Sequence, residues 1–302
     1  MDIDQLRSFD RVVRDGSFTK AAARLNVTQA TISARIAKLE ELVGGPLLTR
    51  GRRIELTERG ATFLPYARRV LSTLVESEDA LRSVDRGRIG LATLRSVTGY
   101  LTAPSVAAFL TDHPQVELTV EEGRHRDVAE WLHDRQIDLA VIGWPNFDPL
   151  LDTIEPLALF REPALLVASA ELAARIGPEP TLERVFAIAP HFLTHFWWQV
   201  TPEAILAMRR RARTASHVPF EPGRLLIAGG HAVGHLLGPS IRAELAAGDL
   251  VDLAPVDMPP LYRDSALVAG VAGAMERPLV AELASRLVET AASLRILHAD
   301  RR

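Results

Sequence analysis

Apolar side chains recur every three or four residues through the first 43 positions, and short breaks divide this pattern into three amphipathic helices. Asp15-Gly16 ends the first helix, and Asn26 tolerates the turn conformation that separates the second helix from the third. Thr28 precedes the third apolar stripe and is placed to cap that helix. The pattern therefore predicts helices over residues 4–13, 19–25 and 29–43.

The pattern then changes to two short extended segments and one long apolar seam. Residues 47–50 and 53–56 flank a Gly51-Arg52 turn, which predicts a small basic hairpin. From Thr57 onward, apolar residues at helical spacing continue to residue 84 with charged residues between them. A seam of this kind is typical of a helix that pairs with a partner helix, so we expect a homodimer or a homotetramer.

Beyond residue 88, predicted strands and helices alternate, which favours a parallel sheet flanked by helices. The overall fold class is therefore α/β, with an all-α winged helix-turn-helix segment and a long helix in front. The predicted strands cover residues 89–93, 116–121, 139–143, 164–168, 186–189, 250–253 and 265–271. The predicted helices cover residues 101–111, 128–135, 202–212, 240–247 and 278–292.

Composition narrows the class of protein. The 302 residues are 47% hydrophobic and 24% charged, and this length favours two or more domains. No run of 18 apolar residues occurs and the first residues are acidic, so we expect a cytoplasmic protein without a signal peptide or membrane span. The chain contains no cysteine, which excludes disulfides, thiolate nucleophiles and cysteine-based zinc sites.

Charge is distributed unevenly along the chain. Residues 1–60 contain 11 Lys/Arg and 8 Asp/Glu, which gives them a net charge of +3. Because the whole chain has a net charge of −3, residues 61–302 carry a net charge of −6. A basic head on an acidic body suits a DNA-binding segment joined to a module that does not bind DNA, because phosphate attraction supplies much of nucleic-acid affinity.

The third predicted helix carries short polar side chains in its first turns, as a helix that enters the major groove requires. Gln29 can make a bidentate contact to adenine, and the hairpin arginines can lie along the flanking phosphates. A merely solvated helix face is the alternative. The candidate residues for binding double-stranded DNA are Thr28, Gln29, Thr31, Ser33, Arg35, Arg50, Arg52 and Arg53.

Six segments at the N-terminus resemble, in order and spacing, the signature of LysR-type transcriptional regulators over about the first 65 residues. They are DQLRSF (4–9), GSFTKAA (16–22), LNVTQATIS (25–33), IAKLE (36–40), LLTR (47–50) and LTERG (56–60). The resemblance implies that Gln29 and Ser33 read bases. Ala30 stands where the family commonly has Pro, and Ala34 where Arg or Gln is frequent, so base preference there does not carry over.

The resemblance also implies a domain organisation. A DNA-binding domain would cover residues 1–57, a linker and dimerisation helix residues 58–87, and an effector-binding domain residues 88–302. The effector domain would be built like a periplasmic binding protein, with one lobe of residues 88–160 and 268–302 and a second lobe of residues 161–267. Closure of the lobes on a ligand would then modulate promoter binding.

Three loops after predicted strands are candidates for the effector site, since ligands of open α/β sheets bind beyond the carboxyl ends of strands. Arg95, Ser96 and Arg124 can together hold a carboxylate, which suggests a small anionic or zwitterionic effector. The alternative is that Ser96 caps a helix and both arginines form surface ion pairs. The full candidate set is Arg95, Ser96, Thr98, Arg124, His125, Trp144, His195 and His231.

Two alternatives remain open from the sequence. His191/His195 and His231/His235 each show the i,i+4 spacing that places two imidazoles on one helix face, for a metal- or pH-responsive regulator. A hydrolytic α/β enzyme is the second, but no Gly-x-Ser-x-Gly, phosphate loop or His-Glu-x-x-His accompanies the scattered Ser, His and Asp. We therefore expect neither an enzyme nor a bound cofactor. Trp197-Trp198 is either a core plug or an aromatic wall for a ligand.

Overall fold

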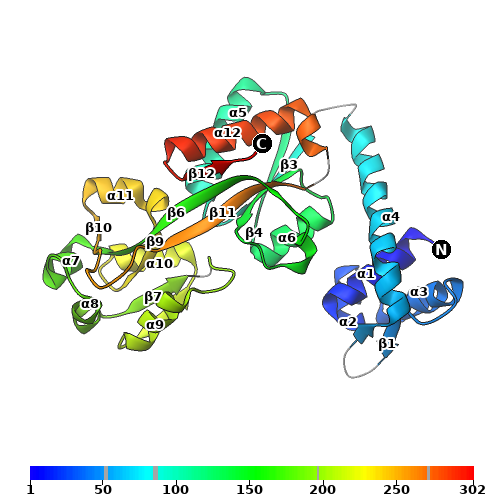
Figure 1. The fold of residues 1–302 in the computed structure, drawn as a ribbon, viewed down its shortest axis with the longest axis horizontal. Helices are drawn as coiled ribbons and strands as arrows, with labels where there is room; N and C mark the ends of the chain where they lie inside the picture. The colour runs from blue at the N-terminus through cyan, green and yellow to red at the C-terminus, as the bar shows by residue number, and fades with distance from the viewer. Residues whose placement is uncertain (51–53, 84–87, 196, 271–272) are drawn as a thin grey trace. The chain divides into compact units, whose positions relative to one another are not determined.

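The chain forms two compact units, Met1–Asp85 and Arg86–Arg302, each described by itself (Figure 1). The computed structural model describes residues 1–50, 54–83, 88–195, 197–270 and 273–302, with the side chains of residues 50 and 75–83 outside the description. No helix within these ranges combines the length and apolar character needed to cross a membrane.

The first unit has the predicted tri-helical core, a hairpin and a long helix. Side-chain caps start the three short helices: Asp2 accepts from the Gln5 amide, Ser17 from the Lys20 amide, and Thr28 from the Thr31 amide. The predicted bounds agree with the structure to within about two residues. The elements are α1 (Ile3–Asp15), α2 (Phe18–Arg24), α3 (Gln29–Leu42), β1 (Leu48–Arg50), β2 (Ile54–Leu56) and α4 (Glu58–Ser83).

The start of α4 is fixed against the hairpin by a close approach at Gly60. The Thr57 hydroxyl accepts from the Gly60 amide at 3.0 Å, the contact that a helix-capping residue makes. A Cβ at Gly60 would lie 2.0 Å from the Leu47 carbonyl oxygen, so any larger residue would push the helix off the strand. The first turn of α4 is therefore packed against the hairpin within the first unit.

The second unit is built on one mixed sheet in the order β4-β3-β5-β11-β6-β9-β7-β8. The prediction of a parallel sheet is confirmed at both ends, where β3 pairs in parallel with β4 and β5, and β7 with β8 and β9. It is wrong in the middle, because β6 and β11 run antiparallel to their neighbours. The strands are β3 (Arg88–Leu94), β4 (Glu117–Gly123), β5 (Leu139–Gly143), β6 (Pro156–Ser169), β7 (Phe192–His195), β8 (Ala215–Val218), β9 (Val233–Leu237), β10 (Leu250–Asp252), β11 (Tyr262–Ala269) and β12 (Leu297–Asp300).

The long strand β6 belongs to both ends of this sheet. Its first half pairs with β11 and β12, and its second half pairs with β9 and β10. We call the end that contains β3, β4 and β5 lobe I, and the end that contains β7, β8 and β9 lobe II (Figure 1). Because the sheet is continuous through β6 and β11, the residue bounds predicted for the lobes stay predictions.

Helices cover the sheet in both lobes. The α-helices are α5 (Ala103–Asp112), α6 (His125–His133), α7 (Ala170–Ile176), α8 (Leu182–Ile188), α9 (Glu203–Arg211), α10 (Phe220–Ala228), α11 (Arg242–Ala247) and α12 (Pro278–Ser293). Single turns of other helix types are η1 (Thr98–Thr102), η2 (Pro149–Leu151), η3 (Gly238–Ile241) and η4 (Ala274–Glu276).

The strand predicted over residues 186–189 is wrong, because this segment is the end of helix α8. Thr181 caps the helix by accepting from the Arg184 amide, and Leu182, Val185 and Phe186 are buried at helical spacing. The apolar run is too short for its periodicity to be recognised. Similarly short elements, including α7, α10, β7, β8 and β9, were not predicted.

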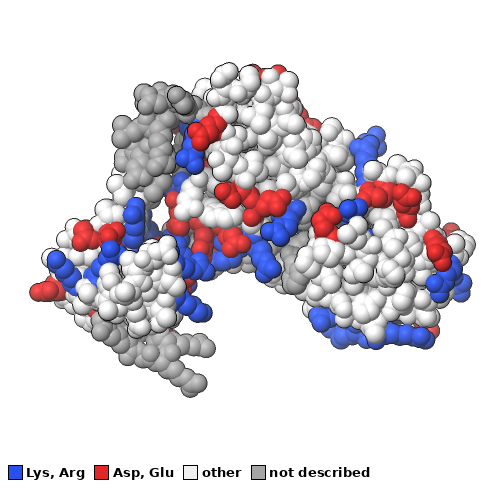
Figure 2. Space-filling view, turned by 180° about the vertical axis from the view of Figure 1, so that it is seen from behind, with Lys and Arg blue, Asp and Glu red and all other residues white. Residues whose placement is uncertain are grey.

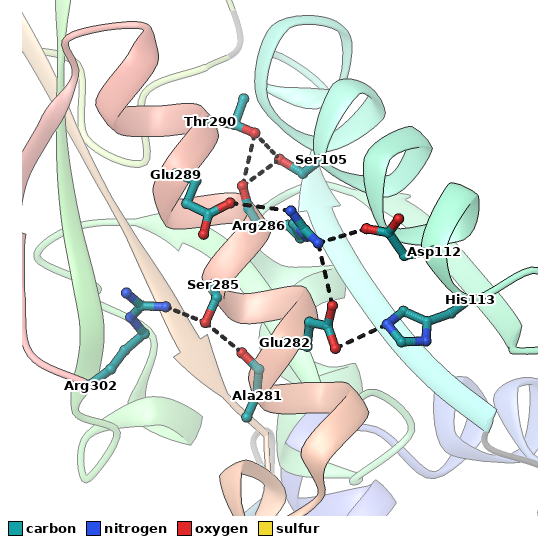
Figure 3. Close-up of polar contacts among 10 residues, drawn as sticks. All are labelled: Ser105, Asp112, His113, Ala281, Glu282, Ser285, Arg286, Glu289, Thr290 and Arg302. Carbon is teal, nitrogen blue, oxygen red and sulfur yellow. Dashed lines mark hydrogen bonds and ion pairs between the residues drawn. The ribbon is translucent and has the colours of Figure 1, made fainter.

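In lobe I, α12 packs along α5 through a set of polar contacts (Figure 3). The Ser105 and Thr290 hydroxyls lie 2.8 Å apart, His113 Nε2 lies 2.9 Å from a Glu282 oxygen, and Arg286 donates to Asp112 at 2.6 Å. These contacts hold the predicted C-terminal helix against the first helix of the lobe, about 180 residues earlier in the chain.

Candidate nucleic-acid interface and ligand cleft

The N-terminal half of α3 presents polar side chains on one face and apolar ones on the other. Ile32, Ile36 and Leu39 are fully buried, whereas Thr28 and Gln29 are exposed. The remaining candidates on this helix, Thr31, Ser33 and Arg35, are half-buried. The structure thus gathers five of the predicted DNA-binding residues on one helix, with the shape that a recognition helix requires.

Several of these side chains already have partners. The Thr28 and Thr31 hydroxyls lie 2.8 Å apart, and the Thr19 hydroxyl donates to Gln29 Oε1 at 3.4 Å. Arg35 forms an ion pair with Asp4 of α1 at 2.5 Å. This pair occupies one amino group of the guanidinium, so a phosphate or base contact through that group would have to compete with Asp4. Among the described residues, the Gln29 side chain is held by one long hydrogen bond.

The predicted wing lies largely outside the described residues. Arg50 is the last residue of β1, but its side chain is outside the description, and Arg52 and Arg53 fall in residues 51–53, which are also outside it. The strands themselves pair as predicted, with Leu48 opposite Leu56 and Arg50 opposite Ile54. A phosphate-contacting role for these three arginines stays a prediction.

The surface of α4 carries exposed apolar side chains in the same unit. Tyr66 is 58% and Val70 48% exposed, and Leu42 at the end of α3 is 53% exposed. An open hollow of about 570 Å³ lies beside them, lined by Val43, Glu58, Arg59, Thr62, Phe63 and Tyr66. Exposed apolar groups at helical spacing are what the predicted pairing of this helix with a second helix requires.

In the second unit, the carboxylate site expected from Arg95, Ser96 and Arg124 does not form as a cluster. Arg95 is 75% exposed and lies 3.6 Å from Glu122, while Arg124 is exposed at the start of α6. Ser96 is buried and accepts a hydrogen bond from Arg263. Arg95 and Arg124 follow Leu94 and Gly123, which are paired in register, so their backbones are neighbours at the carboxyl ends of β3 and β4.

A buried ion pair that the sequence analysis missed lies beneath this edge. Arg263 of β11 and Glu162 of β6 are directly opposite in the sheet, 3% and 0% exposed, and their side chains meet at 2.6 Å. Tyr100 donates to Glu162 at 2.6 Å and accepts from Arg263 at 3.0 Å. Ser265 also donates to Glu162, at 3.3 Å. We call these residues, together with Ser96, the buried polar cluster.

The opposite face of the same two strands carries a second ion pair, in which the basic residue belongs to β6 and the acidic residue to β11. Arg161 and Asp264 form two hydrogen bonds of 2.8 Å, and both are partly exposed. The sequence signal is the pair of dipeptides Arg161-Glu162 and Arg263-Asp264, which match only when the strands are antiparallel and in this register. Such a signal is visible only after the strand pairing is known.

The segment after β7 closes over the buried polar cluster. Trp197 is 5% exposed, and the Arg263 guanidinium lies over its ring at 5.9 Å from the centroid. The Trp197 carbonyl accepts from His125 Nε2 at 3.3 Å, and Gln199 Oε1 accepts from the Phe147 amide at 3.2 Å. Trp197 is thus a core plug and belongs to a large hydrophobic cluster of this unit. The neighbouring Trp198 is half-buried against this hydrophobic cluster.

The other residues predicted to bind the effector differ in their burial and in their contacts. Trp144 is half-buried against the same hydrophobic cluster, and the Thr98 hydroxyl donates to the Leu94 carbonyl at 3.5 Å. The His125 ring occupies space left by Gly143, where a Cβ would lie 2.6 Å from its Cε1 atom. His231 is exposed beside Gly229, before β9 begins. No contact of the described residues brings His231 to the buried polar cluster.

The paired histidines do not lie on helices, so the spacing argument for a metal site is wrong. His195 ends β7 and His235 lies within β9. Burial lowers the pKa of His195 to about 4 and that of His235 to about 3. Both ring nitrogens of His235 lack a hydrogen-bond partner, as does His195 Nε2. Among the described residues no three His, Asp or Glu side chains group as metal ligands.

Surface charge on the second unit is mixed rather than of one sign. On the face shown in Figure 2, acidic and basic side chains are interspersed, with a row of basic ones along the lower edge of the lobe that contains α9. The last turn of α9 carries Arg209, Arg210 and Arg211, and Arg210 is paired with Glu203 at 2.5 Å. This face lacks the extended positive field typical of a DNA-binding surface.

Comparison with protein families assigns both units. A model described as bacterial regulatory helix-turn-helix protein, lysR family, matches residues 3–61, and one described as LysR substrate binding domain matches residues 82–292.

The chain is 33% identical over 151 residues to the HTH-type transcriptional regulator YvbU of Bacillus subtilis, covering 48% of this chain and 52% of YvbU. It is 34% identical over 174 residues to the regulator CfxR of Cupriavidus necator, covering 56% and 53%. The alignments thus span about half the length of the curated relatives.

Solved structures share the fold along nearly the whole chain. ArgP from Mycobacterium tuberculosis is 24% identical with a TM-score of 0.58, covering 97% of this chain and 98% of ArgP. Full-length CbnR, solved in complex with its target DNA, is 22% identical with a TM-score of 0.52, covering 96% and 100%. At these identities the likeness establishes a common two-lobed α/β fold behind an N-terminal helix-turn-helix segment.

Proposed function

This chain belongs to the LysR family of bacterial regulatory helix-turn-helix proteins, and from that membership we propose that it binds promoter DNA through α3 and regulates transcription in response to a small molecule held in the cleft of its second unit. The observation that carries the first part is the two-sided character of α3. Its apolar face is fully buried in the core of the first unit, and its polar face, with Gln29 at the first turn, is exposed.

Oligomerisation through α4 is part of the proposal. The exposed Tyr66 and Val70 give this helix an apolar stripe that a second copy can cover. A dimer, or a pair of dimers, would place one α3 per protomer into successive major grooves of a partly palindromic site. The effector would act by changing the placement of the dimers and hence the bend of the DNA. In this account the protein acts in the cytoplasm, where the promoter is.

The effector cleft is proposed at the boundary between lobes I and II, where the loops after β3, β4 and β5 meet the segment after β7. Arg95 and Arg124 lie at the rim of the proposed cleft, but each has an acidic neighbour, Glu122 at 3.6 Å from Arg95 and Asp127, which accepts from the Arg124 amide. The buried polar cluster is also electrically balanced, since Glu162 compensates Arg263. The anionic or zwitterionic effector expected from the sequence therefore gains little support from the charges around the proposed cleft.

The alternatives weighed from the sequence receive less support. The matched family, the relatives and the similar structures are transcriptional regulators, so a hydrolytic enzyme is set aside. A histidine-based switch near neutral pH is not favoured, because burial keeps His195 and His235 uncharged well below pH 6.

The proposed function is tested by fluorescence anisotropy with the promoter fragment upstream of the chain's own reading frame. Affinity should fall steeply with salt concentration. Gln29→Ala should weaken discrimination at one base pair, by about 1–3 kcal/mol. Arg52→Ala should weaken binding to all sequences alike and flatten the salt dependence. Binding that ignores salt, or that is unaltered in both variants, would show that α3 and the hairpin do not dock on DNA as proposed.

A further inference from the structure

The cleft between the lobes is filled by the protein's own side chains. One continuous hydrophobic cluster contains Leu91 and Val141 of lobe I together with Leu237 at the end of β9 and Trp197 after β7. Phe220, the first residue of α10, also packs against this cluster. Side chains from both lobes therefore belong to one hydrophobic cluster, and Trp197 is a buried member of it.

The Trp197 ring lies in a slot with an aromatic lining and a cationic cover. Its centroid is 5.4 Å from that of His195 and 6.0 Å from that of Trp198, both in edge-to-face geometry. Phe220 lies 6.1 Å away at a shallow angle of 34°, and the Arg263 guanidinium covers the ring at 5.9 Å. These spacings are those of favourable ring-ring and cation-π contacts, so the slot suits a flat aromatic system.

The backbone that carries Trp197 is held by few contacts. Residues 197–202 belong to neither helix nor strand. Among the described residues, two hydrogen bonds join this segment to lobe I: His125 donates to the Trp197 carbonyl at 3.3 Å, and the Phe147 amide donates to the Gln199 side chain at 3.2 Å. The ring can therefore leave its slot without the loss of a strand or helix, in contrast to Glu162 and Arg263, which are fixed in the sheet.

The floor of the slot is polar but carries no net charge. Glu162 compensates Arg263, and three donor groups of the guanidinium are already used by Glu162, Ser96 and Tyr100. His125, beside Arg263, is kept uncharged because burial and the guanidinium lower the pKa of its imidazole. A ligand that brought a carboxylate to this floor would add an uncompensated buried charge, which is costly, whereas an uncharged ring would not.

We propose that the cleft binds a flat, uncharged aromatic molecule, whose ring replaces the Trp197 side chain against Arg263. The proposal rests on the proposed function, since it names the ligand class of the same effector cleft. Trp197 then acts as an internal occupant that keeps the cleft closed in the unliganded protein. The ligand must displace it, and the displaced segment at residues 197–199 releases its two contacts to lobe I.

The first test uses indole as the probe on the full chain. Trp197→Ala should bind indole in isothermal titration calorimetry at least about tenfold more tightly than indole-3-carboxylate, because the charged analogue meets a floor with no free cation. Indole should also raise the melting temperature of this variant more than that of the wild type. Trp131→Ala is the control, since Trp131 packs on the same cluster from α6, where its ring lies against Gly123, whereas the cation-π contact described for Arg263 is with Trp197.

Three outcomes would overturn the proposal: no indole binding to Trp197→Ala, equal or tighter binding of indole-3-carboxylate, or an equal gain of indole binding in Trp131→Ala. A second measurement avoids the substitution. In wild-type protein labelled with 5-fluorotryptophan, indole should move the ¹⁹F resonance of Trp197 toward that of an exposed side chain and leave that of Trp131 in place. Unchanged Trp197 resonance at saturating indole would also overturn it.

Removal of the negative charge of Glu162 tests whether the balanced charge beneath Trp197 selects an uncharged ligand. Glu162→Gln keeps the size of the side chain but removes the charge that compensates Arg263. In the Trp197→Ala/Glu162→Gln variant, preference should change from indole to indole-3-carboxylate; an unchanged preference would contradict the charge argument.

Salt-sensitive promoter binding is measured in the same preparations. If that binding persists while indole fails to bind, the ligand class is wrong and the regulator assignment stands. If promoter binding is absent, the proposed function itself fails.

Discussion

The DNA-reading face of α3 and the floor of the cleft are built in opposite ways. The first is a set of exposed and half-buried polar residues within eight positions of sequence, held on a helix whose other face is buried. The second is a set of buried polar residues drawn from β6, β11 and η1, more than 100 positions apart at the extremes. An exposed local site tolerates change in its side chains, whereas a buried non-local one couples its chemistry to the stability of the fold.

The same contrast is present within the two central strands. Glu162–Arg263 and Arg161–Asp264 pair the same kinds of residue across the same strands, one on the buried face and one on the exposed face. The environment rather than the identity of the partners should therefore decide what each pair contributes.

The largest expected effect is the loss of one partner of the buried pair. Arg263→Ala leaves Glu162 charged and buried, so it should lower the free energy of unfolding by about 3–5 kcal/mol, measured by urea denaturation. Arg161→Ala is the matched control on the exposed face, and it should have a small effect that shrinks further in high salt. Equal losses in the two variants would show that burial does not distinguish the pairs.

Acid should destabilise lobe II through its buried histidines. The folded-state pKa values of His195, about 4, and His235, about 3, lie below the ordinary value of 6.5. The unfolded chain therefore binds more protons than the folded one below pH 6.5, and stability falls as the pH decreases from about 6.5 toward 4. Each histidine should contribute a slope of up to about 1.4 kcal/mol per pH unit in urea denaturation.

His235→Leu removes one of these groups and should flatten the slope. A slope that survives His235→Leu in full would mean that His235 does not carry the pH dependence.

The smallest expected effect concerns the start of α3. Thr28→Ala removes the side chain that accepts from the Thr31 amide at 3.1 Å and should cost about 1 kcal/mol of local stability. Hydrogen exchange of the α3 amides in the full chain measures this loss. Thr62→Ala, within exposed α4, also removes a threonine hydroxyl but no cap, so exchange there should not accelerate. Equal acceleration at both sites would argue against a capping role for Thr28.

The sequence predicts the first unit well because its determinants are local. Ser17 and Thr28 cap helices whose apolar spacing is long enough to identify, and Asn26 adopts the left-handed conformation expected of a turn residue, with φ of 53°. The same reasoning fails at residues 186–189, where four apolar residues fit a strand or a helix equally and Thr181, which decides the matter, lies five positions earlier.

The cleft could be predicted in outline but not in chemistry. Ser96, His125 and Trp144 follow strands whose carboxyl ends meet. The structure places Ser96 in the buried polar cluster, His125 near Arg263, and Trp144 against the hydrophobic cluster that contains Trp197. Arg263 and Glu162 could not be found in this way, because their importance depends on the antiparallel register of β6 and β11. The buried cation of this region is Arg263 rather than the predicted Arg95, and the sequence alone does not distinguish buried from exposed arginines.

Pro163 lies at the point where the pairing of β6 passes from β11 to β9. Pro163 lies opposite Tyr262, and the next residue, Ala164, lies opposite Leu237. Because proline has no N–H to give to a neighbouring strand, the sheet is easiest to bend at this residue. If the lobes rotate about it, atoms far from the pivot travel most and those beside it hardly move. Glu162 and Arg263, adjacent to the pivot, would then stay joined while Trp197 swings away, and the protein could open without separating its two buried charges.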